Sequence, residues 1–347
     1  MKHPSPYNTL QSYLENSNFR KVMVVCDERI LQLHEEFVRI HFADNQHTQF
    51  FFFPIPATES HKEMSMVMQL LDQLLIHHFD KNHLIINLGG GIISDLGGFA
   101  AAVYKRGIPF VNVPTTLLGM VDAAHGGKNG VNFHHLKNGL GSIYFPQQVF
   151  IEPLFLYTLS DQEWLNGFAE LLKTALIGDT ELWYKLELWV LGESLSQLRS
   201  RISAQVIKQV ASIKNGLVQQ DPQDRGVRQQ LNFGHTIGHA LESLHLEKEI
   251  ELPHGFAVAA GIYYETELAT RKGILETNQK KRIQRVVQKL YDIPQLDLSE
   301  QSRLIHFISQ DKKNKNGEIH MSLISEIGKG IHGVPVSIAE IESLFRE

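Results

Sequence analysis

The sequence is poor in cysteine and lacks the marks of export or membrane insertion. Cys26 is the single cysteine among 347 residues, so the chain cannot form an internal disulfide, which is typical of a reducing compartment. Residues 1–20 are polar and contain no apolar signal-peptide core. No apolar run is long enough to span a bilayer. We therefore expect a cytoplasmic, enzyme-like protein.

An excess of positive charge is also absent. The chain has 33 Lys and Arg residues against 38 Asp and Glu residues, which gives a formal net charge of −5. The basic runs at residues 280–282 and 312–313 are short, and this argues against a nucleic-acid-binding protein. The hydrophobic content of 43% fits a globular protein with a large core, and the length favours two domains.

Apolar runs alternate with helix-like segments in the first half of the chain. The expected strands are residues 21–26, 49–54, 84–88 and 110–113, and the expected helices between them are residues 28–42 and 61–79. Continuous apolar strands separated by helices indicate a parallel sheet that is covered on both faces. We predict an α/β, Rossmann-like nucleotide-binding domain over residues 1–160.

This alternation stops after about residue 157. The segments with helical spacing are then residues 161–178, 181–198, 199–220, 235–246 and 255–272. We predict an all-helical (all-α) second domain over residues 161–347. Ligands of open α/β sheets bind at the carboxyl ends of the strands, so we expect the site in the cleft between the domains.

A run of three glycines, residues 89–91, follows an expected strand and opens a helix. Glycine allows close approach to a pyrophosphate, and a helix N-terminus favours an anion. The run is not the G-x-G-x-x-G fingerprint, so a plain tight turn explains it equally well. Thr115 and Thr116 add hydroxyls after the next strand, and the two features together favour a nucleotide. The P-loop pattern G-x-x-x-x-G-K-S/T is missing.

A second glycine-rich stretch, residues 121–132, carries a positive charge. It contains Lys128, and Lys137 and Asn138 follow shortly after it. Lysines, amides and glycines suit a phosphate or carboxylate on a substrate. A polar surface loop is the alternative, and the clustering of the lysines favours the anion site.

The segment LNFGHTIGHALE places His235 and His239 four residues apart, so both project from one helical face. Glu170 and His254 are further candidate ligands, because Glu and His bind Zn²⁺. The chain contains 18 histidines, most of which need no ligand role. Spacing alone leaves open whether His235 and His239 bind a metal or are packed residues.

Glu170 and Lys173 lie three residues apart on an expected helix, as in a simple surface ion pair. Their neighbours Phe168, Leu171 and Leu172 are apolar, however. This favours a buried face, where an unpaired charge is costly.

These segments, in this order, resemble the sugar phosphate cyclases of the 3-dehydroquinate synthase family. The matching stretches lie between about residues 20 and 330 and are GGGIISDLGGFAAAVYKRGIPFVNVPTTLLGMVDAAHGGKNGVN, KNGLG, GFAELLKTALIGD, RQQLNFGHTIGHALE, LPHGFAVAAG and DKKNKNG. The resemblance implies a fold like that of the glycerol dehydrogenases, with a nucleotide-binding α/β domain and a helical metal-binding domain. It implies NAD⁺, a divalent metal (usually Zn²⁺, with Co²⁺ as the alternative) and a homodimer.

The resemblance also implies roles for individual residues. The implied metal ligands are Glu170, His235 and His254, whereas His239 moves to the substrate phosphate. The other implied phosphate contacts are Lys128, Asn138, Asn232, Lys312 or Lys313, and Arg106 from across a dimer interface. Lys214 and Arg228 are implied to hold a carboxylate and hydroxyls, and Asp122 and Lys173 to contact the reacting hydroxyls. The implied NAD⁺ contacts are Asp27, Glu59, Lys62, Gly90, Gly91, Ile92, Asp95, Thr115, Thr116, Lys137, Phe155 and Thr158.

The implied activity is that of a phosphorus–oxygen lyase of the shikimate pathway, which leads to the aromatic amino acids. It converts 3-deoxy-D-arabino-heptulosonate 7-phosphate to 3-dehydroquinate and phosphate. The implied steps are transient NAD-dependent oxidation, phosphate elimination, reduction and intramolecular aldol closure, so there is no net redox change.

Three alternatives are distinguishable. A sister cyclase would act on a neutral sugar phosphate such as sedoheptulose 7-phosphate or glucose 6-phosphate, but Lys214 and Arg228 favour a carboxylate. A glycerol-type metal-dependent dehydrogenase needs no phosphate-binding set. In a non-catalytic binding protein, the metal-binding residues would be replaced by residues that cannot bind a metal. The chain departs from the family pattern at His125, Gly139, Ser160 and Asp224, and none of these is an implied ligand.

Overall fold

The computed structural model describes residues 9–43, 47–134, 136–309 and 319–345. The chain divides into two compact units, Met1–Trp164 and Leu165–Glu347. Within the described residues, no helix combines the length and apolar character needed to cross a membrane.

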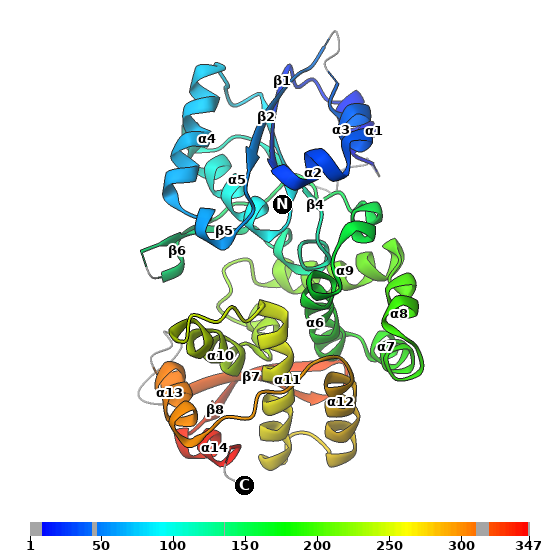
Figure 1. Ribbon diagram of the computed structural model, residues 1–347, viewed down its shortest axis with the longest axis vertical. Coiled ribbons are helices and arrows are strands. Elements are labelled where there is room, and N and C mark those ends of the chain that lie inside the picture. The colour runs from blue at the N-terminus through cyan, green and yellow to red at the C-terminus, as the bar shows by residue number, and fades with distance from the viewer. Residues whose placement is uncertain (1–8, 44–46, 135, 310–318, 346–347) are drawn as a thin grey trace. The chain divides into compact units, whose positions relative to one another are not determined.

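A four-stranded parallel sheet forms the centre of the N-terminal unit (Figure 1). Its strands are β1 (Lys21–Asp27), β2 (Gln49–Ile55), β3 (Leu84–Gly89) and β4 (Phe110–Pro114), in the order β2-β1-β3-β4. All six residues of β3 are buried, as expected for a strand covered on both faces. The prediction of a parallel α/β domain with these four strands is confirmed.

Helices cover both faces of this sheet. They are α1 (Leu10–Glu15), α2 (Glu28–Leu33), α3 (Glu35–His41), α4 (Met64–Ile76) and α5 (Gly91–Val103). Met23, Val25 and Ile85 share one core cluster with residues of α4 and α5. On β2 the successive phenylalanines divide: Phe51 packs on Phe79 after α4, and Phe50 packs on Phe42 after α3. This alternation is the two-residue period of a strand between two helical layers.

The strand order places a topological switch point between β1 and β3. The chain goes from β1 outward to β2 and then returns to β3 on the other side of β1. Crevices at the carboxyl ends of strands, where the order reverses, bind ligands in open α/β sheets. Asp27 ends β1 and Gly89 ends β3, so the glycine run lies at this point.

The charged glycine stretch at residues 121–132 is only partly a loop. A π-helical turn covers Gly119–Ala123, and Lys128–Phe133 forms strand β5, which pairs antiparallel with β6 (Leu136–Ile143). Gly130 lies opposite Gly141, and a Cβ on either residue would approach a carbonyl oxygen of the partner strand to within 3.0 Å. The glycines therefore permit close strand pairing here, whereas their spacing in the sequence favoured a loop that binds a ligand.

The C-terminal unit is helical, as predicted. Its helices are α6 (Asp161–Gly178), α7 (Thr180–Gly192), α8 (Leu195–Arg201), α9 (Ala204–Gln220), α10 (His235–Glu247), α11 (His254–Arg271), α12 (Thr277–Leu290), α13 (Leu298–Ser309) and α14 (Ile338–Ser343). The helix expected over residues 181–198 is two helices, because Ser194 and Gln197 form a capping box that starts α8.

The prediction of an all-α second domain needs one correction. Strands β7 (Ile319–Glu326) and β8 (Lys329–Val336) form an antiparallel hairpin in this unit. The apolar Ile319, Met321 and Leu323 alternate in the sequence with polar residues, although Ser322 is buried as well. Gly328 turns the chain with a φ of 89°. This two-residue alternation was the available sequence signal.

Helices α10 and α11 pack against each other at glycines. A Cβ on Gly261 would lie 1.8 Å from the carbonyl oxygen of Gly234. Backbone cannot yield as a flexible side chain can, so we expect Gly261→Ala to separate the helices. The expected loss is about 3 kcal/mol in the free energy of unfolding, together with a lower metal affinity.

Gly216 supplies the matched control, because it lies inside α9 and a Cβ there meets no atom within 4 Å. We expect Gly216→Ala to raise stability by about 0.4–1 kcal/mol, since alanine is the better helix former. Urea unfolding of both variants measures these changes. Equal stability of Gly261→Ala and the wild type would contradict the close approach of α10 and α11.

Candidate active site

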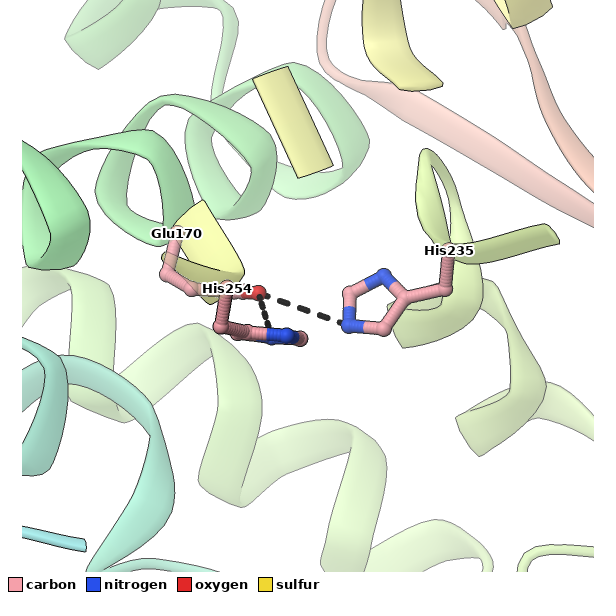
Figure 2. A group of neighbouring side chains, drawn as sticks. All are labelled: Glu170, His235 and His254. Atoms are coloured by element: carbon pink, nitrogen blue, oxygen red, sulfur yellow. Dashed lines mark hydrogen bonds and ion pairs between the residues drawn. The ribbon is translucent and has the colours of Figure 1, made fainter. Parts of the chain in front are cut away.

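Three side chains from three helices meet in the C-terminal unit. Glu170 comes from α6, His235 is the first residue of α10, and His254 is the first residue of α11. Figure 2 shows both imidazole rings beside the Glu170 carboxylate. The Glu170 Oε1 atom lies 3.2 Å from Nε2 of His254 and 3.4 Å from Nε2 of His235.

This group fits a divalent metal. Its three potential ligand atoms all lie within 4.8 Å of one another. Two ligands of a tetrahedral Zn²⁺ with bonds of about 2.0–2.1 Å are separated by roughly 3.3 Å, and carboxylate oxygen and imidazole nitrogen are its usual ligands. The distances from Glu170 to the two histidines are therefore close to those between two ligands of one zinc ion.

The other nitrogen of each histidine has a partner that fixes the ring. Nδ1 of His235 lies 3.1 Å from the carbonyl oxygen of Phe233, to which it donates a hydrogen bond in the neutral tautomer that carries its proton on Nδ1. Nδ1 of His254 lies 3.6 Å from Oε1 of Glu242. Both rings thus keep Nε2 directed at Glu170, which is the arrangement of metal-binding histidines.

Glu170 is completely buried and still carries a negative charge. Burial alone raises the pKa of this carboxyl, but Lys173 and His254 together outweigh it and lower the pKa to about 2. Nζ of Lys173, itself 1% exposed, lies 2.5 Å from Oε2 of Glu170. The apolar neighbours of Glu170 and Lys173 predicted a buried face, and the structure confirms this prediction.

The two histidines differ in charge when no metal is bound. Burial, followed by the nearby charges of Lys173, His239 and His254, lowers the pKa of His235 well below its usual value. Burial also lowers the pKa of His254, but hydrogen bonds and charges of Glu170 and Glu242 overcome it and raise this pKa to about 10. At neutral pH, His235 is therefore ready to bind a cation and His254 holds a proton.

Metal binding is consequently expected to release about one proton at pH 7–9, and the affinity should rise about tenfold per pH unit. The sign follows from His254: its raised pKa keeps it protonated below about pH 10, and a metal must displace that proton. Titration calorimetry in two buffers of different ionisation enthalpy counts the released protons. A Zn²⁺ affinity that is the same at pH 7 and pH 9, after correction for the competing chelator, would contradict this charge state.

His239 lies in the same ring cluster but not in the Glu170 group. Its ring centroid is 5.2 Å from that of His235 and 6.1 Å from that of His254. Its ligand atoms group instead with Glu242 and His254. This placement is compatible with the phosphate role implied for His239, which stays a prediction.

Buried cations and an amide lie elsewhere in this unit. Lys214 on α9 is 7% exposed, and Arg228 on the 3₁₀ turn Val227–Asn232 is 3% exposed. Nη1 of Arg228 donates to the carbonyl oxygen of Pro222 at 3.2 Å. Asn232 ends the same turn. Lys312 and Lys313 lie outside the described residues, so their predicted phosphate contacts stay open.

Several residues predicted to bind NAD⁺ lie at the carboxyl ends of the strands. Asp27 caps α2 and accepts hydrogen bonds from Arg29. Gly90 caps α5, and a Cβ there would lie 3.0 Å from Cγ2 of Thr116. The side-chain oxygen of Thr116 accepts a hydrogen bond from the backbone of Gly119 at 3.0 Å. Because Gly90 has no side chain, an anion can approach the backbone at the start of α5.

A second set of predicted residues is joined by hydrogen bonds. Nζ of Lys62 donates to Oδ2 of Asp95 at 2.5 Å and to Oδ1 of Asn138 at 2.6 Å. Asn132 accepts from the backbone of Asn138 and donates to Oε1 of Glu59. Candidates for the nucleotide and for the phosphate thus share one network, which sequence spacing did not indicate.

The remaining candidate residues of the N-terminal unit differ in their burial and in their contacts. Phe155 is fully buried and packs against Phe37, with ring centroids 4.9 Å apart. The side chain of Thr158 bonds to Nε2 of His34 at 2.9 Å. Arg106 is exposed and has a φ of 65°. The others lie in the π-helical turn (Asp122), in α5 (Gly91 and Ile92), after β4 (Thr115), in β5 (Lys128) and in β6 (Lys137).

Three of the four departures from the family pattern have local structural explanations. His125 is buried, and its Nε2 lies 2.9 Å from the carbonyl oxygen of Met120, so it closes the π-helical turn. Ser160 exchanges hydrogen bonds with Glu163 at the start of α6. Asp224 takes a φ of 57°, a conformation that aspartate tolerates better than most residues.

Two family models together match most of this chain. The model of the 3-dehydroquinate synthase N-terminal region matches residues 52–166, and that of the C-terminal region matches residues 167–314. The chain belongs to the 3-dehydroquinate synthase family. This is a family of enzymes, and the match covers both units.

Relatives named 3-dehydroquinate synthase align over nearly the whole length of this family member. The protein of Campylobacter concisus is 34% identical over 99% of this chain and 96% of its own length. That of Rippkaea orientalis is 35% identical over 99% of this chain and 93% of its own length. The family assignment thus rests on complete domains.

Solved structures place the fold among the sugar phosphate cyclases. The 2-epi-5-epi-valiolone synthase of Streptomyces hygroscopicus, solved with NAD⁺ and Zn²⁺ bound, has a TM-score of 0.83. It is 29% identical and covers 96% of this chain and 91% of its own chain. A probable glycerol dehydrogenase of Sinorhizobium meliloti has a TM-score of 0.63 at 13% identity over 97% of this chain and 92% of its own, which shows the shared fold alone.

Proposed function

We propose that this member of the family converts 3-deoxy-D-arabino-heptulosonate 7-phosphate to 3-dehydroquinate and phosphate, working as a homodimer in the cytoplasm. The observation that carries the proposal is the intact group of Glu170, His235 and His254, with ligand atoms at metal-binding separations. Full-length relatives at 34–35% identity bear the name of this activity.

NAD⁺ and a divalent metal, most suitably Zn²⁺, would supply a reversible hydride acceptor and an electrophile for the reacting hydroxyl. Glu170, His235 and His254 would hold the metal. The carboxyl ends of β1, β3 and β4, with the N-terminus of α5, would hold the nucleotide. The solved valiolone synthase, which contains both NAD⁺ and Zn²⁺, supports this pair of cofactors.

Four further residues are proposed to orient the substrate. Lys173 lies against Glu170 and would donate a hydrogen bond to a substrate hydroxyl, with Asp122 as a second polar contact. Lys214 and Arg228 are buried cations, and burial strengthens the attraction between a cation and a substrate carboxylate. We assign the carboxylate to Arg228, because a planar guanidinium binds it in two places.

The phosphate has its own candidate contacts. They are Lys128, Asn138, Asn232 and His239, with Arg106 contributed by a second copy of the chain. Each can donate a hydrogen bond to a phosphate oxygen, and the cationic members also balance its charge.

A sister cyclase acting on a neutral sugar phosphate is the second candidate, favoured by the likeness to the valiolone synthase. Lys214 and Arg228 argue for the acidic substrate, because they are buried cations that suit a substrate carboxylate, which a neutral sugar phosphate lacks.

The direct test is to incubate the pure protein with NAD⁺, Zn²⁺ and the heptulosonate phosphate. We expect release of inorganic phosphate in equal amount to 3-dehydroquinate, with no net formation of NADH. Parallel incubations with sedoheptulose 7-phosphate and glucose 6-phosphate should release none. Phosphate release from a neutral sugar phosphate alone would overturn the proposal and support the sister cyclase. Net NADH formation would support a dehydrogenase.

A further inference from the structure

Glu265 is a buried acid that lies behind the metal group. It belongs to α11, has no exposed surface, and lies among the apolar residues of that helix. Its Oε2 accepts a hydrogen bond from the backbone N–H of Gly234 at 2.6 Å, and its Oε1 accepts one from the N–H of Ile237 at 3.1 Å. One carboxylate thus bonds to the backbone on both sides of His235.

These two hydrogen bonds stabilise the start of α10. The first turn of a helix leaves backbone N–H groups without helical partners, and a side chain of the N-cap residue usually accepts from them. The N-cap residue here is Gly234, which has no side chain and a φ of 80°. Glu265 supplies the missing acceptor from the neighbouring helix, and its negative charge suits the positive end of the helix dipole.

The position of α10 leaves little freedom for His235. Gly261 lies against the carbonyl oxygen of Gly234, and Gly238 lies against the backbone of Ala257. The ring is fixed in turn by the hydrogen bond between its Nδ1 and the carbonyl of Phe233. The Glu265 hydrogen bonds, the helix contact and the ring contact together set where Nε2 points.

The two helices support each other's histidine. Glu242 of α10 lies 3.6 Å from Nδ1 of His254, which begins α11. Glu265 of α11 holds the backbone around His235, which begins α10. Each helix therefore contributes one ligand and one carboxylate that fixes the ligand of the other helix.

We propose that Glu265 is a positioning residue of the metal site: it fixes the backbone around His235 so that Nε2 of His235 faces Glu170. The inference rests on the proposed metal site. Removing groups that orient metal ligands typically lowers metal affinity about 10- to 100-fold.

The test compares Zn²⁺ affinity in the wild type, Glu265→Gln, Glu265→Asp and Glu267→Gln, by competition with a chromogenic chelator. Glutamine keeps the size of the side chain but can accept from only one of the two N–H groups, because its amide nitrogen is a donor. We expect Zn²⁺ to bind about 10- to 100-fold more weakly to Glu265→Gln, with an altered visible spectrum of the Co²⁺ form. Excess metal should restore activity.

Glu267 is the matched control, because it lies on the same helix but pairs with Arg271 and Lys280. Glu267→Gln should bind Zn²⁺ like the wild type. His235→Ala serves as the reference for a lost ligand.

The outcomes separate the inference from the metal site itself. A wild type that binds no Zn²⁺ would overturn both. Wild-type affinity and an unchanged Co²⁺ spectrum in Glu265→Gln, with only a lower melting temperature, would reduce Glu265 to a structural helix cap. If Glu265→Gln does not fold, Glu265→Asp decides: weaker Zn²⁺ binding supports the inference, and wild-type binding overturns it.

Discussion

Replacing Glu170 with glutamine is expected to lower the stability of the metal-free protein by about 3–5 kcal/mol and to abolish tight Zn²⁺ binding. Glu170 is fully buried, and it is the counter-charge of Lys173 and of protonated His254. The neutral amide would remove the negative charge that faces both cations, although Glu242 remains 3.6 Å from His254. Urea unfolding of the metal-free protein measures the loss of stability.

A double variant separates the ion pair from the metal. Glu170→Gln combined with Lys173→Met removes both members of the pair, and we expect it to recover much of the stability without recovering Zn²⁺ binding. Glu181→Gln on the exposed surface of α7 is the control and should change neither quantity. Wild-type stability of the single variant would show that Glu170 and Lys173 do not form a buried ion pair.

Replacing Arg228 with alanine is expected to lower kcat/KM for the heptulosonate phosphate roughly 30- to 5,000-fold, which corresponds to about 2–5 kcal/mol for a lost buried charge contact. Arg228 is 3% exposed, so water cannot readily replace its guanidinium. Inhibition by the product 3-dehydroquinate, which carries the carboxylate, should weaken in parallel. Inhibition by inorganic phosphate should not change, because other residues are assigned to phosphate.

Two further variants make this result specific. Arg225→Ala removes an exposed arginine three residues away and should leave kcat/KM unchanged. Arg228→Lys keeps the charge but loses the planar pair of donors, so we expect partial activity. If Arg228→Ala weakened inhibition by phosphate and by 3-dehydroquinate equally, Arg228 would not be a specific carboxylate contact.

Much of the fold was predictable because the local patterns and the tertiary structure agree. The runs that became β1 and β3 are mostly apolar, since both of their faces are buried. The β5–β6 hairpin was missed because Gly130 lies in a glycine-rich stretch that was interpreted as a ligand loop, whereas Gly130 and Gly141 permit close strand pairing. The β7–β8 hairpin was missed because its two-residue alternation follows a long series of helices.

The candidate site was predictable in its residues and not in its contacts. Helical spacing grouped His235 with His239. In the structure, the ligand atoms of His235 lie at metal-binding distances from those of His254 and Glu170. Spacing describes only the face of one helix, whereas these three residues come from α6, α10 and α11. The family resemblance named the same three residues, and it named none of the carboxylates behind them.

The sequence by itself determined the family, the α/β start of the chain, the helical second half and the identity of the candidate ligands. These depend on residue type and local period, which are present in the chain before it folds. Only the tertiary structure decided that Glu170 is a buried, charged partner of Lys173, and that Glu242 and Glu265 support His254 and His235. The physical reason is that charge state and ring orientation depend on burial and on distances between helices, and packing alone sets both.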